Sequence, residues 1–494
     1  MHGGKVRVRY APSPTGFLHL GGLRTALFNA LLALRHGGQF ILRIEDTDRT
    51  RLVEGAAKSF EEDLRWLGIP VDEGPLTGGR HGPYTQSERG EIYREHVEQL
   101  HQCGHVYRCF CSAQTLEDLR QRQSRSASRG SQSFYDRRCS FLTLEQVRSK
   151  LEAGVPHTYR LRVPAGVTAV QDALRGTMEF PNAAVDDQIL LKSDGMPTYH
   201  LASVVDDHLM GISHVIRGEE WVMSSPKHQL LYRAFGWAPP QFVHLPLLLN
   251  AADRSKLSKR QADASVSSYR ERGFLPPAIL NFVAFLGWSP LQRGDLSQQD
   301  HFLSLSEMAS RFSLADLHRS PAVVDMAKLR WFNAHYLRES AAADSLALLP
   351  SLRRLISDAF PATRSDTSDQ TLISLLKLAV LDGRIALLSE VPAHFAYLFA
   401  SPQLPSVDGL ASSVSPPLSA GQVAAAISHF AQHRDQDLLA SVKPLVSSLG
   451  ITRKQAYNLL RLLLTDTEGG PPLAEILSLF SHDELVRRLD ISKR

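Results

Sequence analysis

Hydrophobic and polar positions change their spacing along the chain, and this change predicts the main elements. Up to about residue 335, short apolar runs alternate with longer amphipathic segments. The runs at residues 6–10 and 40–44 predict strands, whereas the spacing at 23–34 and 54–67 predicts helices. This β-α-β-α order predicts a parallel sheet with helices on its faces.

Other parts of the chain follow different patterns. Residues 85–185 interrupt the alternation with helices and short strands, and it returns at 187–191, 199–205 and 214–217. Beyond about residue 335, nearly every apolar pattern is helical. We therefore predict an α/β domain at 1–84 and 186–240, an inserted α+β domain at 85–185, a connecting region at 241–334 and an all-α region at 335–494.

The composition agrees with a multidomain globular protein. A chain of 494 residues is too long for a single hydrophobic core. Its contents of 43% hydrophobic and 21% charged residues are typical of globular proteins. The net charge of +4 permits a polyanionic partner without requiring one, and four cysteines do not form a disulfide scaffold. No apolar run approaches the roughly 20 residues that span a bilayer, and no leader segment is visible before the first strand.

A first motif occupies residues 9–22, which read Arg-Tyr-Ala-Pro-Ser-Pro-Thr-Gly-Phe-Leu-His-Leu-Gly-Gly. A strand, a turn and a helix that begins near Gly21 would direct free N–H groups and a positive helix end toward an anion. Gly21 and Gly22 allow close approach of a nucleotide, and His19 could donate to a phosphate oxygen. Taken alone, the same residues also fit an ordinary strand-to-helix turn with a capping histidine.

A second motif at residues 253–260 reads Asp-Arg-Ser-Lys-Leu-Ser-Lys-Arg. Lys256 and Lys259 lie three positions apart with Ser258 between them, so both ammonium groups could reach one anion. Alone, such a run fits a solvated basic surface or a weak nucleic-acid patch. A triphosphate held between the two motifs would be neutralised from both sides, so the pair indicates nucleotide chemistry.

With the stretches at 43–48, 72–75, 82–89 and 193–221, the two motifs resemble those of class I aminoacyl-tRNA synthetases. More narrowly, the chain is similar to glutamyl-tRNA synthetases of the bacterial and organellar type. Residues 19–22 resemble the HIGH signature with glycine at its last position, and residues 256–260 resemble KMSKS with Leu257 for methionine and Arg260 for the last serine. The resemblance is strong over about residues 5–290 and weaker in the helical part.

The resemblance implies a Rossmann-type catalytic domain at 1–84 and 186–240, with an acceptor-stem domain inserted at 85–185. A stem-contact region at 241–334 would carry the basic loop, and the all-α region at 335–494 would bind the anticodon. The implied glutamate-binding residues are Arg9, Tyr10, Ala11, Ser13, Glu45, Tyr199, His200, Leu201, Ala202, Ser203 and Arg217. The implied ATP-binding residues are His19, Gly21, Gly22, Glu220, Trp221, Lys256, Leu257, Ser258, Lys259 and Arg260, of which His19, Lys256 and Lys259 are catalytic.

The implied roles suit these residue types. Arg9 and Arg217 would hold the glutamate carboxylates, because a guanidinium binds a carboxylate through two hydrogen bonds and stays charged. Ser13 and Glu45 would take the α-amino group, and Tyr199 would stand beside the carboxylate. Ser203 occupies a position where relatives often carry asparagine.

The implied reaction activates L-glutamate with ATP, carrying Mg²⁺ on its phosphates, to glutamyl-adenylate. The glutamyl group then passes to the 3′ end of tRNA(Glu), and use of tRNA(Gln) stays open. Members of the family typically need bound tRNA for the first step. The resemblance further implies a monomer that binds no membrane. The wording of the motifs is most like that of animal mitochondrial relatives, so we expect the mitochondrial matrix, with bacterial cytoplasm as the alternative.

Three of the cysteines raise the question of zinc. Cys109, Cys111 and Cys139 align with a zinc site that some relatives complete with histidine, where this chain has Phe141. Because a phenyl ring cannot bind a metal, we expect no zinc and reduced thiols.

Three alternatives remain open at this point. A glutaminyl-tRNA synthetase shares the fold, but its branch typically reads Pro-Glu-Pro-Asn-Gly where residues 12–16 read Pro-Ser-Pro-Thr-Gly. A glutamyl-queuosine tRNA(Asp) synthetase lacks the anticodon half. A catalytically silent RNA-binding protein descended from a synthetase would not need Arg9, Glu45, His19, Arg217 and Lys259 together.

Overall fold

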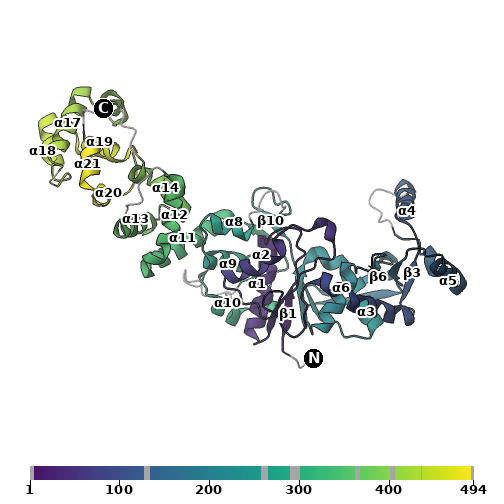
Figure 1. The fold of residues 1–494 in the computed structure, drawn as a ribbon. Coiled ribbons are helices and arrows are strands. Elements are labelled where there is room, and N and C mark those ends of the chain that lie inside the picture. Colours follow the sequence, from purple (N-terminus) through teal and green to yellow (C-terminus); the bar gives the residue numbers. More distant parts are fainter. Residues whose placement is uncertain are drawn as a thin grey trace. The chain divides into compact units, whose positions relative to one another are not determined.

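The computed structural model describes residues 5–126, 134–257, 265–289, 301–361, 368–381, 383–400, 406–434 and 437–490. The chain divides into two compact units (Figure 1). The first unit comprises Met1–Arg270 and Pro276–Lys328, and the second comprises Glu271–Leu275 and Leu329–Arg494. The basic residues Ser258, Lys259 and Arg260 lie outside the described residues.

A six-stranded sheet forms the centre of the first unit, in the order β2-β1-β8-β9-β5-β6. All neighbouring pairs are parallel except β5 and β6, which are antiparallel. The predicted α/β fold with a parallel sheet is confirmed, with adjacent parallel strands supplied by distant parts of the chain. The strands are β1 (Arg7–Tyr10), β2 (Gln39–Leu42), β5 (Val167–Asp172), β6 (Gly176–Pro181), β8 (His214–Gly218) and β9 (Gln241–Leu245).

Helix α1 (Leu20–Arg35) covers one face of this sheet, where it packs on β1, β2 and β8. Its residues Leu23, Leu27 and Leu31 recur at helical spacing and are completely buried. Val8 of β1 and Ile41 of β2 are completely buried as well. Residues 11–19 join the end of β1 to the start of α1, and this stripe packs the helix back on the sheet.

Strand pairing divides the chain differently from the predicted domain limits. Strands β5 and β6 fall within residues 85–185, predicted as an insertion, yet they extend the main sheet through β9. Conversely, β7 (Ile189–Leu191), predicted as part of the α/β domain, joins β3 (Val106–Cys109) and β4 (Thr158–Leu161) in a separate antiparallel sheet. Both differences arise from long-range strand pairing, which local patterns do not determine.

The other elements of the first unit surround these sheets. Strands β10 (Leu248–Asn250) and β11 (Ala322–Val324) form a parallel pair. The further helices are α2 (Ala56–Trp66), α3 (Gly90–Gln102), α4 (Ala113–Ser126), α5 (Leu144–Glu152), α6 (Tyr199–Leu209), α7 (Ser225–Phe235), α8 (Val266–Glu271), α9 (Pro276–Ala284) and α10 (Leu305–Arg311).

The described residues of the second unit form helices and no strands, which confirms the predicted helical half. Two apolar clusters make its core, and serine or threonine caps with a glutamine three residues on begin α17 and α19. None of the described helices is both long and apolar enough to cross a membrane. The helices are α11 (Met326–Ala343), α12 (Leu349–Ala359), α13 (Asp369–Leu381), α14 (Val391–His394), α15 (Ala396–Phe399), α16 (Val407–Ser413), α17 (Ala420–Gln432), α18 (Val442–Leu449), α19 (Arg453–Thr465), α20 (Leu473–Leu479) and α21 (His482–Arg488).

Candidate active site

A cavity of about 730 Å³ lies where β1 and β8 end and α1 begins. This position outside the carboxyl ends of parallel strands is where open α/β sheets bind ligands. The cavity brings together every described residue of the predicted site except four consecutive ones on α6. The predicted residues that line it are Arg9, Tyr10, Ala11, Ser13, His19, Gly21, Gly22, Glu45, Tyr199, Arg217, Glu220, Trp221, Lys256 and Leu257.

His19 stands at the start of α1 and lines the cavity. Its extended backbone makes it the N-cap, and its Nδ1 accepts a hydrogen bond from the N–H of Gly22 at 3.1 Å. Because Nδ1 accepts, the proton of the neutral ring is on Nε2. The capping role and a role in the cavity are therefore compatible, and the positive end of the α1 dipole faces the same space.

Gly22 is required by its neighbour Tyr10. A β-carbon at position 22 would lie 2.5 Å from the Tyr10 hydroxyl oxygen and 3.2 Å from Cδ1 of Leu18. Tyr10 is itself buried, with its ring at an edge-to-face contact with Phe60. The side chain that normally ends a HIGH signature therefore has no room here.

We expect Gly22→Ala to destabilise the first unit by about 1–3 kcal/mol, because the added methyl group overpacks against Tyr10. Tyr10→Phe in the same chain should relieve most of this loss, since the ring carbon Cζ would then be the nearest Tyr10 atom, at 3.5 Å. Urea unfolding of both single variants and the double variant measures the coupling. Simple additivity of the two single effects would contradict this account of the glycine.

Arg9 of the cavity wall and the buried Arg43 share a buried aspartate. Arg9 donates through Nε to Oδ1 of Asp207 at 3.0 Å, and Arg43 donates through Nη1 to the same oxygen at 2.7 Å. Arg43 also donates to Glu45 at 3.0 Å. All four side chains are buried. Each of these cations therefore has a carboxylate partner inside the protein.

The two carboxylates respond differently to this environment. Burial raises the pKa of Glu45 above its ordinary value, against the opposing pull of Arg43 and Arg9. Burial also acts to raise the pKa of Asp207, but Arg9 and Arg43 outweigh it and hold that pKa below the ordinary value. A bound ammonium group beside Glu45 would favour its charged form, whereas Asp207 is already ionised.

Arg217 also lines the cavity and has a different set of partners. Its Nε donates to Nε2 of His244 at 3.0 Å, and Nη1 faces the Tyr199 hydroxyl at 3.0 Å and His228 Nδ1 at 3.2 Å. Its Nη2 donates to the hydroxyl of Ser225 at 3.1 Å and the carbonyl of Trp221 at 3.3 Å. Only 5% of Arg217 is exposed.

All of these partners are neutral. Burial, reinforced by Arg217, holds the pKa of His228 well below its ordinary value, and burial likewise lowers the pKa of His244. Within the described ranges, no carboxylate lies within ion-pair distance of Arg217. A buried cation without a counter-ion is costly, so this side of the cavity favours an anionic ligand.

Aromatic rings and the second motif border the rest of the cavity. The Tyr199 ring packs on that of Trp221, with centroids 4.3 Å apart. Leu257 donates its backbone N–H to the carbonyl of Leu248 at 2.9 Å, which brings Lys256 and Leu257 to the cavity wall.

Four predicted residues do not line the cavity, and their place on α6 explains why. Leu201 and Ala202 are completely buried and belong to the apolar core behind the cavity. Ser203 is buried one turn after Tyr199, and its hydroxyl has no hydrogen-bond partner among the residues that the structure describes. His200 instead faces His228, with Nδ1 3.1 Å from Nε2. These four residues do not line the cavity, and their role in binding glutamate stays a prediction.

Other residues of the site were missed from the sequence. Arg24 lines the cavity from α1 and donates to the carbonyls of Pro246 and Leu286. It falls one turn after Gly21, a signal that helical spacing could have given. Asp207 and His244 carried no local signal, since their partners are distant in the sequence.

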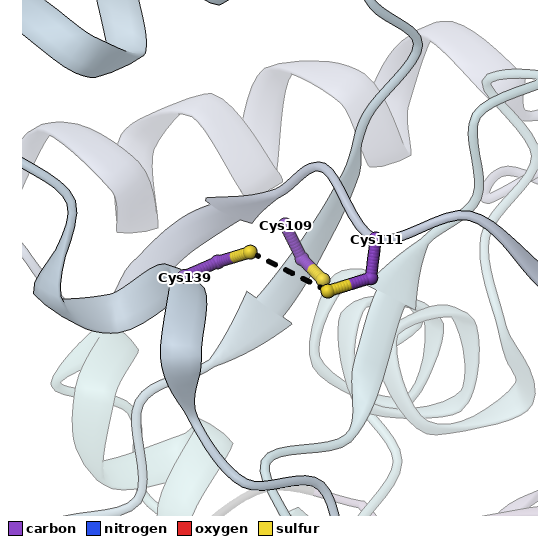
Figure 2. Close-up of side chains that lie close together, drawn as sticks. All are labelled: Cys109, Cys111 and Cys139. Atoms are coloured by element: carbon purple, nitrogen blue, oxygen red, sulfur yellow. Dashed lines mark hydrogen bonds between the residues drawn. The ribbon is translucent and has the colours of Figure 1, made fainter. Parts of the chain in front are cut away.

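Three thiols form a separate cluster, shown in Figure 2. The sulfur atoms of Cys109, Cys111 and Cys139 all lie within 4.8 Å of one another, and Cys111 Sγ is 3.6 Å from Cys139 Sγ. Tetrahedral zinc with Zn–S bonds of about 2.3 Å would place its sulfurs about 3.8 Å apart. The three thiols therefore fit such an ion.

The fourth side of the cluster is occupied by Tyr135. Its hydroxyl is 3.4 Å from Cys109 Sγ and 3.5 Å from Cys111 Sγ, whereas Phe141 is 80% exposed. Sequence reasoning foresaw that Phe141 would not contribute, but not the presence of Tyr135. The absence of zinc remains a prediction, which the metal content of the purified protein tests.

Comparison with known proteins gives full-length matches. Residues 5–331 match the family of class I tRNA synthetases for E and Q, catalytic domain, and residues 334–492 match the anticodon binding domain family. The chain is 40% identical over 502 aligned residues to a glutamate–tRNA ligase of Chlorobaculum parvum, covering 99% of this chain and 98% of that protein.

Two further similar proteins are a mitochondrial enzyme and an enzyme of known crystal structure. The mitochondrial glutamate–tRNA ligase of Saccharomyces cerevisiae is 40% identical, over 98% of this chain and 90% of that protein. The crystal structure of a glutamate tRNA ligase from Elizabethkingia meningosepticum, in complex with its amino acid, matches with a TM-score of 0.85 and 34% identity. That match covers 98% of each chain.

Proposed function

Because the chain belongs to the glutamate–tRNA ligases among the class I tRNA synthetases, we propose that its cavity binds L-glutamate with the side-chain carboxylate on Arg217. The enzyme activates glutamate with ATP and transfers it to tRNA. The alternatives of a glutaminyl enzyme and a silent RNA-binding protein are not favoured by the full-length relatives.

The binding of glutamate is inferred from one observation, the lack of a charged partner for the buried guanidinium of Arg217 within the described part of the chain. This buried guanidinium has only neutral partners among the described residues, and a carboxylate would supply the missing charge. The neutral amide of glutamine would leave the cation uncompensated and bring N–H donors toward a donor. Tyr199 accepts from Arg217, so its own hydroxyl proton is directed to another acceptor, such as a substrate oxygen.

Three other residues of the cavity wall suit the α-amino and α-carboxylate groups. Glu45 offers a carboxylate to the ammonium group, and the hydroxyl of Ser13 adds a polar contact. Arg9 keeps its Nε and Nη2 on Asp207, which leaves Nη1 to approach the α-carboxylate. In this arrangement, Asp207 fixes the arginine while the substrate meets its outer edge.

ATP fits the space next to α1 and the second motif. Gly21 and Gly22 line this space at the positive end of the helix, and Glu220, Trp221 and Leu257 border it. His19 and Lys256 could stabilise charge that develops on the phosphates. Ser258, Lys259 and Arg260 complete the motif outside the described residues. Magnesium bound to the phosphates would neutralise part of their charge.

The reaction needs no nucleophile from the protein. The α-carboxylate of glutamate attacks the α-phosphorus of ATP, and pyrophosphate leaves. The ribose hydroxyl at the 3′ end of tRNA then attacks the acyl carbon, and AMP leaves. Catalysis consists of holding these groups in line and stabilising charge in the transition state.

Three finer features belong to the same proposal. The enzyme charges tRNA(Glu), with tRNA(Gln) as a second candidate substrate, and acts as a monomer. The amino-acid sequences of the motifs favour a location in the mitochondrial matrix. Bacterial cytoplasm is the alternative, since bacterial and mitochondrial relatives are equally similar at 40% identity.

Aminoacylation of tRNA(Glu) and tRNA(Gln) transcripts with glutamate and with glutamine tests the proposal. We expect charging with glutamate only, and pyrophosphate exchange that needs tRNA. A heat-denatured sample and a transcript lacking the 3′-terminal adenosine serve as controls. Comparable charging with glutamine would overturn the assignment of the anionic pocket.

A further inference from the structure

Two buried residues that do not line the cavity reach Arg217 from behind. Arg217 is on β8, His244 stands beside it on the parallel neighbour β9, and Asp172 ends β5, which pairs with β9 on the other side. His244 is completely buried and Asp172 is 4% exposed. The strand order therefore places an acid, an imidazole and the guanidinium in one line.

Hydrogen bonding determines the protonation of His244. Its Nδ1 lies 2.7 Å from Oδ2 of Asp172, and its Nε2 lies 3.0 Å from Nε of Arg217. A guanidinium can only donate, so Nε2 must accept and the ring proton must be on Nδ1. Asp172 is committed to accepting, because its Oδ1 also receives the N–H groups of Leu174 and Arg175 at 2.9 and 2.8 Å.

The same arrangement keeps His244 neutral. Burial lowers the pKa of His244, and the nearby Arg217 opposes a second positive charge. Although burial acts to raise the pKa of Asp172, its hydrogen bonds to His244 and the backbone hold that pKa below its ordinary value. The line therefore consists of a carboxylate, a neutral imidazole and a guanidinium.

Arg9 and Arg217 differ in how their positive charges are compensated. Arg9 contacts Asp207 directly, so its charge is compensated inside the protein. Arg217 is held at the same Nε position by an imidazole lone pair, and the acid stands one ring further away. The guanidinium is oriented without being neutralised.

We propose that His244 and Asp172 are positioning residues that hold Arg217 by a neutral lone pair and so preserve its charge for the side-chain carboxylate of glutamate. The inference rests on the proposed role of Arg217. Glutamate selectivity then depends on three hydrogen-bonded side chains from three adjacent strands. Of these side chains, only Arg217 would contact the substrate. Loss of the lone pair removes the hydrogen bond at Nε, leaves only the contacts at the two Nη groups, and so loosens the alignment of the guanidinium with the carboxylate.

Two amide variants of His244 separate the hydrogen bond from the fold. In His244→Gln, the amide oxygen can reach the position of Nε2 and accept from Arg217. In His244→Asn, the shorter amide reaches only the position of Nδ1, so it can contact Asp172 but not Arg217. His96→Asn is the matched control, since His96 is a half-buried histidine whose Nδ1 contacts the backbone carbonyl of Ile92.

We expect His244→Asn to raise KM for glutamate by about 10- to 100-fold, the range for a lost hydrogen bond to a charged group. His244→Gln should stay within about threefold of wild type, as should KM for ATP and kcat in both variants. The ratio of kcat/KM for glutamate to that for glutamine should fall in the asparagine variant alone. Melting temperatures and the His96→Asn control identify any general loss of structure.

Several outcomes would overturn the inference. One is a folded asparagine variant with wild-type KM for glutamate, and another is equal impairment of the two amide variants. If the asparagine variant does not fold, the glutamine variant decides: equal rises in KM for glutamate and ATP contradict a positioning role.

Arg217→Gln, measured in the same series, distinguishes failure of the positioning inference from failure of the proposed role of Arg217. If it raises KM for glutamate while His244→Asn does not, only the positioning inference fails. If neither variant changes that KM, the proposed role of Arg217 itself is wrong.

Discussion

Arg217→Gln is expected to lower kcat/KM for glutamate by about 10²- to 10³-fold, chiefly through KM. In the proposed complex the substrate carboxylate compensates the buried guanidinium, and the variant offers the carboxylate a neutral amide instead. KM for ATP should change by less than about threefold, because the proposal places the amino acid, and not the phosphates, on Arg217. Steady-state pyrophosphate exchange with saturating tRNA measures all of these constants.

Arg233→Gln provides the matched control, since Arg233 is exposed near the end of α7. It should leave the constants for both substrates unchanged. Equal losses toward glutamate and ATP in Arg217→Gln would instead indicate that the residue supports the fold of the cavity, and the assignment to the side-chain carboxylate would be withdrawn.

Asp207→Asn is expected to cost about 3–5 kcal/mol of folding free energy, because two buried guanidinium groups would lose their shared carboxylate. Arg9 and Arg43 both contact this side chain, at 3.0 and 2.7 Å. An amide keeps the shape but supplies one acceptor oxygen and brings N–H donors toward cations. Urea unfolding, monitored by circular dichroism and by intrinsic tryptophan fluorescence, measures the loss of folding free energy.

The matched control is Glu62→Gln, which removes an acid from the exposed pair that Glu62 forms with Lys58 at 3.5 Å. That change should cost less than about 1 kcal/mol. A similarly small cost for Asp207→Asn would show that the two arginines do not depend on Asp207.

The pH dependence of this contribution follows from the sign of the shift. The pKa of Asp207 is lower in the folded protein than its ordinary value, so its stabilising effect is complete above that ordinary value, about 3.9. The effect is lost as pH falls through the folded-state pKa. The difference in stability between wild type and Asp207→Asn should therefore be constant near neutral pH and shrink only in strong acid.

Local patterns predicted much of the first half of the site. The strand, turn and helix at residues 7–35 follow from an apolar run, a Pro/Gly turn and helical spacing, and their order brings His19, Gly21 and Gly22 to the cavity. The helical nature of the second unit was visible for the same reason. These features depend on neighbours in the sequence.

The rest depends on strand pairing between distant segments. The sheet places β8 between β1 and β9, and β5 beyond β9, which brings Asp172, Arg217 and His244 together. No local spacing encodes this order, so the partners of Arg217 were missed and β5 and β6 were assigned to the insertion. The contact of Tyr135 with the thiols was missed similarly, since the cysteine spacing says nothing about a tyrosine.

We propose that an uncompensated buried cation, Arg217, selects the acidic side chain of the substrate. The most direct measurement is the ratio of kcat/KM for glutamate to that for glutamine in tRNA-dependent pyrophosphate exchange, compared between wild type and Arg217→Gln. We predict that wild type strongly prefers glutamate and that the ratio falls by about 100-fold or more in the variant. A ratio that is the same in both proteins would contradict the claim.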